Sequence, residues 1–548
     1  MRRLFSFILI FLSFTTQAAE QAAVAMPDSY SADAAVAVLK DGGNAVDAAV
    51  TAGFVLAVTL PEAGNIGGGG FMLIHQDGKA DFLDYREKAP LNAHRDMYLD
   101  DQGQVLRNKP LYGILASGVP GSVMGMWQAH QKYGSKPWKD LLQPAIQLAE
   151  QGFIPHEKLL SHVNGYIERV QKDRHGRNFD QYFSAMQSDM PFKQPELAAT
   201  LKRIAEHGPK DFYQGKTADL LVSFMQKHGG LINKQDMANY QAIWRTPINA
   251  DWQGYQVLSA PPPSSGGIVL VQMLKMQALL SKEFQGLAHN SAQYIHLLAE
   301  LAKLGFADRA EYMGDPDFYQ VPVKDLLADN YLAERAKLVN SKAISSTEKV
   351  KPGLKESEDT THYSVVDKWG NAVSTTTTIN LSFGSGMVVD GAGFLLNDEM
   401  DDFSAKPGVP NFFGAVGKEA NEIAPQKRML SSMTPSILLK GHKVEMVTGS
   451  PGGTTIISSV FQSMLNRVLF GMHAQQLVDA PRIHHQLLPK DEIRHHNGLA
   501  ADVQSRLQDM GYHLKNRGFG DLQVISRNNQ GELEAASQTS GRGKSVVF

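Results

Sequence analysis

The chain contains no cysteine among its 548 residues. This absence excludes disulfide bonds, thiolate zinc sites, iron–sulfur clusters and a cysteine nucleophile. Any covalent catalyst must therefore be a serine, threonine, lysine, aspartate or glutamate.

A strong charge of one sign is also lacking. Lysine and arginine number 53, aspartate and glutamate 56, and the formal net charge is −3. A protein this close to neutral presents no strong field to nucleic acid or to an acidic membrane surface. No stretch after the first twenty residues is long and apolar enough to cross a bilayer. We therefore expect no nucleic-acid partner and no stable membrane span.

The first residues have the pattern of a secretory signal. MRR supplies positive charge, LFSFILIFLSF an apolar core, and TQAA a small-residue cleavage site. The apolar core is short for a membrane anchor, although an uncleaved anchor is the alternative. We predict a signal peptide over residues 1–19 and export to the periplasm.

Two patterns in the first hundred residues predict regular structure. Alanine-rich runs broken by Gly42–Gly43 predict two packed helices that end before Pro61. Alternating apolar residues on both sides of Asp77–Gly78 predict a β-hairpin. From 120 to 350 the chain is expected to be mainly helical, with APPPSSGG at 260–267 interrupting it.

The pattern changes near residue 352, where KPGLKESED is typical of an exposed loop. THYSVVD and AVSTTTTIN then predict one hairpin, SILLKGHKVEMVTGS a second and DLQVISRNNQGELEAA a third. TTIISSVFQSMLNRVLF carries an apolar helical stripe. Hairpins that alternate with amphipathic helices indicate an α+β fold. Two stacked sheets, each covered by helices, would form an α/β/β/α sandwich, which periodicity alone does not require.

The stretch EDTTHYSVVD at 358–367 allows two interpretations. Adjacent threonines are good strand formers, so the pair can be purely structural. Alternatively, cutting the chain before a threonine gives that residue an α-amine of its own. Such an amine titrates near 7.7–8.0 in model peptides, which suits a general base for the neighbouring hydroxyl.

Several long motifs, taken together, resemble the gamma-glutamyltranspeptidases, also called glutathione hydrolases. They are GNIGGGGFML, DYREKAP, DTTHYSVVD, STTTTINLSFGSG, NDEMDDFSAKPGVPN, KRMLSSMTPSI and TGSPGG. The resemblance runs from about residue 22 to the C-terminus. It implies an N-terminal-nucleophile hydrolase fold, formed jointly by a large subunit (20–359) and a small subunit (360–548) after self-cleavage. The two subunits would stay together as a heterodimer.

The resemblance implies a role for each residue of the reaction centre. Cleavage between Asp359 and Thr360 would make Thr360 the nucleophile. Thr378 would orient it through a hydrogen bond. The backbone N–H groups of Gly452 and Gly453 would form the oxyanion hole.

The resemblance also implies a set of groups for a zwitterionic glutamyl substrate. Arg86 would bind the α-carboxylate through its guanidinium fork. The remaining ligands would be Ser431 and Ser432 for the same carboxylate, and Asn380, Glu399 and Asp402 for the α-ammonium. Without the resemblance, an isolated arginine, an acidic run and a pair of serines are each typical of ordinary surface and turns.

One position departs from the family pattern. SAKPGVPNFFGAVG matches the mobile loop that covers the pocket in bacterial members, where a Tyr or Trp commonly bonds the asparagine that matches Asn380. Phe413 stands at that position and can cover the pocket without making the bond. This difference bears on the balance between water and amine acceptors.

No metal or cofactor is expected. His484–His485 and His495–His496 are adjacent pairs that point apart, with no acidic or cysteine partner at ligand spacing. GGGG at 67–70 lacks the GK[ST] ending of a phosphate-binding loop and precedes a strand.

The predicted activity is cleavage of the γ-glutamyl bond of glutathione and related compounds through a γ-glutamyl–threonine ester. The acyl group would pass to water, an amino acid or a dipeptide. Three alternatives remain: an acylase of the same fold that acts on another amide such as a glutaryl-cephalosporin, a non-catalytic γ-glutamyl-binding protein, and a structural envelope protein.

Overall fold

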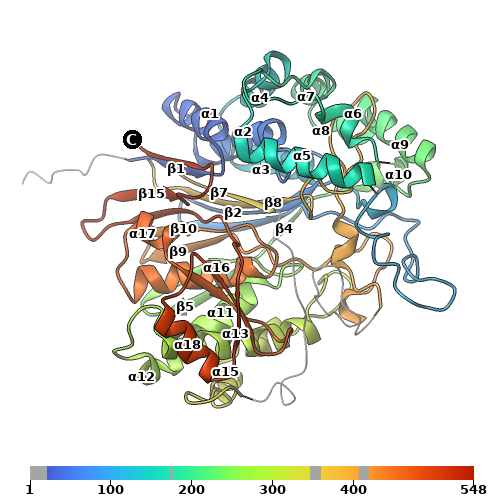
Figure 1. Cartoon of the computed structure of the whole chain (residues 1–548). Helices are drawn as coiled ribbons and strands as arrows, with labels where there is room; N and C mark the ends of the chain where they lie inside the picture. The colour runs from blue at the N-terminus through green and yellow to red at the C-terminus, as the bar shows by residue number, and fades with distance from the viewer. Residues whose placement is uncertain (1–20, 173–176, 346–359, 407–418) are drawn as a thin grey trace, which may run out of the picture.

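A computed structural model describes residues 21–172, 177–345, 360–406 and 419–548. Two stacked β-sheets form the middle of the molecule, with helices covering both outer faces (Figure 1). This is the α/β/β/α arrangement, so the predicted fold is confirmed.

The first sheet has seven strands in the order β16-β1-β7-β8-β2-β3-β4, all antiparallel. Its strands are β1 (Ala23–Met26), β2 (Gly69–Gln76), β3 (Lys79–Asp84), β4 (Ile243–Arg245), β7 (Thr360–Val366), β8 (Ala372–Thr378) and β16 (Lys544–Val547). The hairpin between β2 and β3 is the one predicted from Asp77–Gly78, and both turn residues have positive φ angles.

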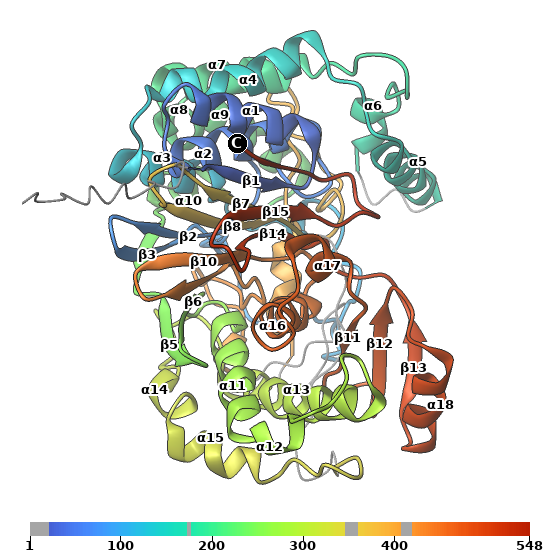
Figure 2. The same cartoon turned by 90° about the vertical axis from the view of Figure 1, so that its left-hand side faces the viewer.

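The second sheet has six strands in the order β15-β14-β10-β9-β6-β5. Its strands are β5 (Ile248–Trp252), β6 (Tyr255–Ser259), β9 (Ser436–Lys440), β10 (Lys443–Thr448), β14 (Gln523–Arg527) and β15 (Leu533–Ser537). A small third sheet, formed by β11 (Arg482–His484), β12 (Glu492–His496) and β13 (His513–Asn516), lies at one side of the molecule (Figure 2). The hairpins predicted for 436–448 and 523–537 are therefore confirmed.

Helices from the first half of the chain cover the first sheet. They are α1 (Ser29–Lys40), α2 (Ala45–Thr59), α3 (Ser122–Tyr133), α4 (Trp138–Gln151), α5 (Glu157–Lys172), α6 (Phe179–Phe183), α7 (Pro195–His207), α8 (Pro209–Gln214), α9 (Lys216–His228) and α10 (Lys234–Asn239). The helix pair predicted before Pro61 is α1 and α2. Helix α2 begins at a capping box in which Asn44 and Asp47 satisfy each other's backbone N–H groups.

The opposite face is covered by helices from both halves of the chain. They are α11 (Gly266–Leu279), α12 (Ser281–Phe284), α13 (Ala292–Tyr312), α14 (Val323–Leu326), α15 (Asp329–Ala336), α16 (Thr455–Val468), α17 (Ala474–Asp479) and α18 (Ala501–Asp509). Helix α16 carries the predicted apolar stripe, buried from Ile456 to Leu465, while Leu469 after it is 38% exposed. Among the described residues no helix has both the length and the apolar composition needed to cross a bilayer.

Three strands interrupt the region that the sequence predicts to be mainly helical. The region 120–350 is not helical throughout, because β4, β5 and β6 occupy 243–259 and give each large sheet an edge strand. The predicted signal peptide (1–19) and the whole of the KPGLKESED loop lie outside the described residues.

The two sheets draw strands from both sides of residue 360. In the first sheet, β7 from the second half of the chain lies between β1 and β8, and β1 in turn lies between β7 and β16. Small hydroxyl side chains join the sheets near β8, where Ser374 Oγ accepts from the Ser436 N–H at 3.0 Å and donates to the Thr448 carbonyl at 3.2 Å. These short side chains let the sheets approach closely around β7 and β8.

Candidate active site

Thr360 is the first residue of β7, which is an interior strand of the first sheet. Its register partner on β8 is Thr378, the last residue of that strand. Thr360 is partly exposed, whereas Thr378 is 3% exposed. The predicted nucleophile and its predicted orienting residue therefore lie side by side at one end of the sheet.

The chain after β8 turns sharply at Asn380, which has φ of 75°. The Asn380 N–H donates to Thr378 Oγ1 at 2.8 Å, and its Nδ2 donates to the Asp398 carbonyl at 2.9 Å. The Leu381 N–H donates to Asp398 Oδ1 at 3.0 Å. These bonds tie the end of β8 to the acidic segment that begins at Asp398. They also support a left-handed conformation, which asparagine adopts more readily than most residues other than glycine.

The acidic segment forms a short 3₁₀-helix, η3 (Glu399–Asp402), that faces Arg86. Arg86 Nη1 lies 2.6 Å from Glu399 Oε2, and Nη2 contacts Asp402 Oδ2. Arg86 and Glu399 are each 1% exposed, while the Asp402 side chain retains 20% exposure. The structure therefore brings the predicted carboxylate ligand and two predicted ammonium ligands into direct contact.

A third carboxylate, Glu87, completes this ionic cluster, with Oε2 at 3.5 Å from Arg86 Nη1. Burial raises the pKa of all three acids, that of Glu87 to about 7, and the attraction of Arg86 offsets only part of this rise. Burial opposes the charge of Arg86, but Glu399 and Asp402 outweigh it and hold the Arg86 pKa above its ordinary value. A bound ammonium group would supply the missing positive charge and favour ionised carboxylates.

Ser431 and Ser432 lie next to this cluster and are almost fully buried. Arg86 reaches the preceding backbone, with Nη2 at 3.5 Å from the Leu430 carbonyl. Asn421 joins the two parts of the site, because its Nδ2 donates to the Asp402 carbonyl at 2.7 Å and its Oδ1 accepts from the Leu430 N–H at 3.0 Å. A second buried arginine, Arg309 of α13, donates from Nη2 to Ser432 Oγ at 3.0 Å.

Gly452 and Gly453 form the turn between β10 and α16. Both have positive φ angles, 123° and 55°, which favour glycine. A Cβ on Gly452 would lie 2.3 Å from Thr455 Oγ1, so the turn also lacks room for a side chain. The Gly452 carbonyl accepts from Thr455 Oγ1 at 2.6 Å. That bond holds the Gly452 carbonyl toward the start of α16, and the oxyanion-hole role of the two glycines stays a prediction.

His362 connects this turn to the strand of Thr360. Its ring packs against Gly449, where an added Cβ would lie 2.2 Å from a ring atom. Its two nitrogens lie 2.9 Å from Thr376 Oγ1 and 3.1 Å from Ser364 Oγ. Burial lowers the His362 pKa to about 3, so the ring is neutral at neutral pH.

Contacts thus connect the Thr360–Thr378 pair through Asn380 to the Arg86 cluster and the backbone before Ser431, while His362 packs against Gly449 in the segment that carries Gly452 and Gly453. Asp359 and Phe413 lie outside the described residues, so the cleavage bond and the predicted lid position stay predictions. The sequence interpretation missed Glu87, Arg309 and Asn421. The only available signal was the position of Glu87 inside DYREKAP, next to Arg86.

The histidine pairs lie in the small third sheet. His484 Nδ1 is 2.8 Å from Ser458 Oγ, His485 Nδ1 is 2.8 Å from the Glu492 carbonyl, and His496 Nε2 is 2.8 Å from Gln538 Nε2. In the parts of the chain that the structure describes, no three histidine, aspartate or glutamate side chains come together as a metal site would require.

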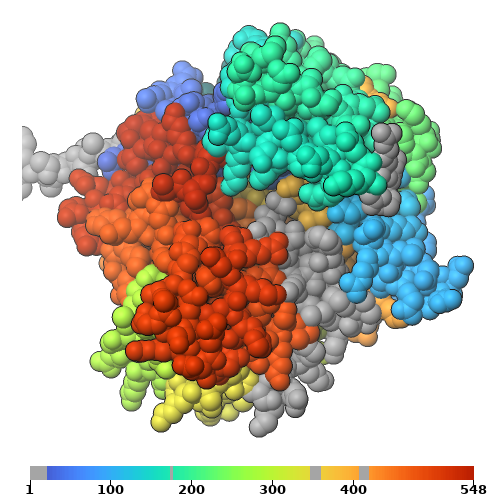
Figure 3. Space-filling model, in the orientation of Figure 1, coloured from blue at the N-terminus to red at the C-terminus, as the bar shows by residue number. Residues whose placement is uncertain are grey.

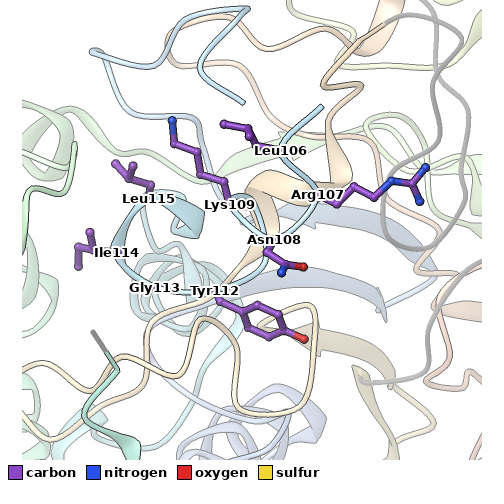
Figure 4. A pocket seen from close by; sticks show the side chains of 8 residues that line it. All are labelled: Leu106, Arg107, Asn108, Lys109, Tyr112, Gly113, Ile114 and Leu115. Carbon is purple, nitrogen blue, oxygen red and sulfur yellow. The ribbon is translucent and has the colours of Figure 1, made fainter. Parts of the chain in front are cut away.

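A pocket of about 730 Å³ opens in the segment that leads to η1 (Ile114–Ala116). This segment, light blue near residue 100, stands out from the body of the molecule in Figure 3. Figure 4 shows Arg107 and Lys109 pointing away from each other at the pocket's edge. Leu111 packs against Leu381, so the pocket borders the turn at Asn380, but its described lining contains none of the predicted site residues.

Comparisons with known proteins agree with this geometry. The model of the family Gamma-glutamyltranspeptidase matches residues 31–548. A glutathione hydrolase proenzyme of Pseudomonas aeruginosa is 54% identical over 529 residues, covering 96% of this chain and 94% of the relative.

Two solved structures are similar as well. A gamma-glutamyltranspeptidase chain from Pseudomonas nitroreducens is 52% identical with a TM-score of 0.58, covering 60% of this chain and 96% of that one. A cephalosporin acylase from Bacillus halodurans is 27% identical with a TM-score of 0.84, covering 96% of both chains. The family match spans nearly the whole chain, and it includes every strand of both sheets except β1 and every described residue of the predicted site. The chain belongs to the gamma-glutamyltranspeptidase family of enzymes.

Proposed function

We propose that this chain cuts itself before Thr360 and then uses Thr360 to transfer γ-glutamyl groups from glutathione and similar compounds. The observation that carries the proposal is the contact of Arg86 with Glu399 and Asp402 beside the Thr360–Thr378 pair. Opposite charges arranged around one buried position suit a substrate end that carries both a carboxylate and an ammonium group.

In the proposed reaction, the α-amine of Thr360 takes the proton of its own hydroxyl as Oγ attacks the γ-carbonyl carbon. The backbone N–H groups of Gly452 and Gly453 stabilise the oxyanion. The protonated amine returns the proton to the leaving amine, and a γ-glutamyl ester on Oγ remains. Water or an amino-acid amine then attacks the ester carbon and gives up a proton to the α-amine. As the C–Oγ bond breaks, the protonated α-amine passes that proton to Oγ, which restores the Thr360 hydroxyl.

The proposed substrate-binding residues distinguish γ-glutamyl amides from glutaryl amides, the alternative substrates most similar to them. A glutaryl amide, as in a glutaryl-cephalosporin, has the same distal carboxylate but lacks the α-ammonium. It would leave the carboxylates of Glu399 and Asp402 without the ammonium charge that balances them, which is costly. The full-length similarity to a cephalosporin acylase keeps this second activity a candidate, and we expect it to be the slower one.

The proposed products are a large subunit of residues 20–359 and a small subunit of residues 360–548, held together by the shared sheets. The large subunit would be 340 residues, or 62% of the chain. The share of this chain that corresponds to the solved P. nitroreducens chain is 60%, in keeping with such a division. Removal of residues 1–19 would release the enzyme to the periplasm.

Denaturing electrophoresis of purified wild type and Thr360→Ala tests the proposal. The wild type should give two bands of about 37 and 21 kDa, in proportion to the 60.1 kDa of the whole chain. The smaller band should begin Thr-Thr-His-Tyr. Thr360→Ala should remain one band of about 58 kDa without activity. A matured and active Thr360→Ala enzyme would refute the assignment, and an uncut wild type that binds without turnover would favour the non-catalytic alternative.

A further inference from the structure

We propose that Arg309 is a positioning residue for donor recognition: it holds the Ser431–Ser432 pair and gives the site a second positive charge for the substrate's α-carboxylate. The inference rests on the proposed function of the same site. It also assigns a role to the APPPSSGG turn, which the sequence motifs leave without one.

Arg309 reaches both serines from helix α13. Its Nη2 donates to Ser432 Oγ at 3.0 Å, and its Nε donates to Ser265 Oγ at 3.0 Å. Ser265 in turn donates from Oγ to the Ser431 carbonyl at 2.8 Å, and its N–H donates to the same oxygen at 2.8 Å. One guanidinium therefore supports Ser432 through its side chain and Ser431 through its backbone.

The neighbouring residue of the turn strengthens this attachment. Ser264 Oγ donates to the Met433 carbonyl at 2.7 Å, and the Ser431 N–H donates to the Pro263 carbonyl at 2.9 Å. The turn at 263–265 thus bonds to the backbone on both sides of Ser432. Arg309 is the charged residue that joins this turn to the serine pair.

The chemistry of arginine fixes the direction of these hydrogen bonds. A guanidinium only donates, so Ser432 Oγ must accept from Arg309 and its hydroxyl hydrogen must point away from that residue. A hydroxyl that accepts from a cation becomes a better donor, because hydrogen bonds in a chain polarise one another. A carboxylate ligand needs a donor, and this arrangement prepares Ser432 to be one.

The charges of the site also require a second cation. Arg86 contacts three carboxylates, those of Glu87, Glu399 and Asp402, so the site would carry an excess of negative charge where a carboxylate has to bind if Arg86 were its sole cation. Arg309 lies close enough to Asp402 to act against the rise of that residue's pKa caused by burial. With Arg309 and the substrate's ammonium, three positive groups face the three carboxylates of Glu87, Glu399 and Asp402, so the substrate's own carboxylate meets less repulsion than it would beside Arg86 alone.

A comparison with Arg335 on α15 separates this role from a purely structural one. Arg335 also donates to α13, from Nη2 to the Leu304 carbonyl at 2.7 Å and to Asp308 Oδ1 at 2.8 Å. Both contacts of Arg335 go to atoms of α13 itself. The hydrogen bonds of Arg309 described above go instead to the serines and the turn that border the site, although Arg309 is only 7% exposed and costly to bury.

Three p-nitroanilide donors test the proposal: the γ-glutamyl compound, the glutaryl compound, which lacks the ammonium, and the 4-aminobutyryl compound, which lacks the carboxylate. Arg309→Met should lower kcat/KM at least about tenfold for the two donors that carry the carboxylate, mainly through KM, because one charge-assisted contact and one fixed donor are lost. The 4-aminobutyryl donor should change less than about threefold. Arg309→Lys should fall between wild type and Arg309→Met.

Controls keep the outcomes distinct. Arg335→Met disturbs the same helix and should not discriminate among the donors. If Arg309→Met fails to fold, judged by thermal unfolding, Ser265→Ala removes one support of the pair and should show the same donor pattern more weakly. Equal losses on all three donors, or no loss on any, would overturn the inference. Absence of γ-glutamyl turnover in the wild type would instead overturn the proposed function.

Discussion

Replacing Thr378 by valine should separate the chemistry of the site from the stability of the sheet. Valine keeps the shape and β-branching of threonine but removes Oγ1, which accepts the Asn380 N–H at 2.8 Å. Asn380 is 8% exposed and has a positive φ, so its N–H would be left buried without this acceptor. Such a loss costs about 1–3 kcal/mol. If the turn at Asn380 moves so that this N–H finds another acceptor, and the site loses the same free energy, kcat/KM should fall roughly 5- to 150-fold.

The neighbouring threonine provides the matched control. Thr377 Oγ1 donates to the Gly69 carbonyl at 2.8 Å, on the face of β8 opposite to Thr378. Thr377→Val should therefore lose similar thermal stability while processing and turnover of γ-glutamyl p-nitroanilide stay near wild type. The assays are electrophoresis of the cut fragments over time, initial-rate kinetics and thermal unfolding. If the two variants have the same kcat/KM, the hydroxyl of Thr378 does not orient the reaction and our reasoning is wrong.

Three further predictions follow from the same geometry. Arg86→Lys should raise KM about 10- to 100-fold with little change in kcat, because lysine cannot replace the fork, whereas the 59%-exposed Arg95→Lys should change neither constant. Because the pKa values of Glu399 and Asp402 are raised, kcat/KM should begin to fall on acidification at a higher pH than it would with ordinary carboxylates. Glu399→Gln should move this acidic side of the pH profile to lower pH. An unchanged profile would contradict the ionic cluster of Arg86 with these acids. Burial depresses the pKa of His362 to about 3, so the contribution of the neutral ring to the free energy of unfolding is present above pH 6.5 and is lost as the pH falls toward 3. About 2 kcal/mol of it should be lost by pH 5. The urea midpoints of wild type and His362→Gln should therefore converge between pH 7.5 and 5.

Local patterns were enough to predict much of the fold. The turn at Asp77–Gly78 needs two positive φ angles, and that dipeptide supplies them. The alternating residues after Thr360 predict β7, and the polar turn after Val366 predicts its return as β8. In contrast, β4 has three residues and pairs with β3, about 160 positions earlier in the chain. No local signal marks so short a strand among helices, because its stability comes from that distant partner.

The site residues also fall into those that local motifs predict and those that only the packed structure reveals. Thr360, Arg86 and the glycine turn lie in motifs long enough to support a family resemblance. Arg309 lies in α13, a 21-residue helix buried on most of its surface, so hydrophobic periodicity does not distinguish it. Its contact with Ser432 spans 123 positions and exists only after the second sheet and its helices have packed. Long-range polar contacts of this kind need the three-dimensional structure.

The pairing of β1 with β16 offers a route to redesign. The backbones of Ala22 and Phe548 are joined by two hydrogen bonds of 2.9 and 3.0 Å, so the beginning and end of the folded body meet. A short peptide could link Phe548 to Gln21, and the gene could then be reopened to start at Thr360. Termini that lie together at the surface tolerate such circular permutation. After removal of the initiator methionine, Thr360 would be the N-terminal residue of the permuted chain. Hydrolysis could then be measured without the self-cleavage step.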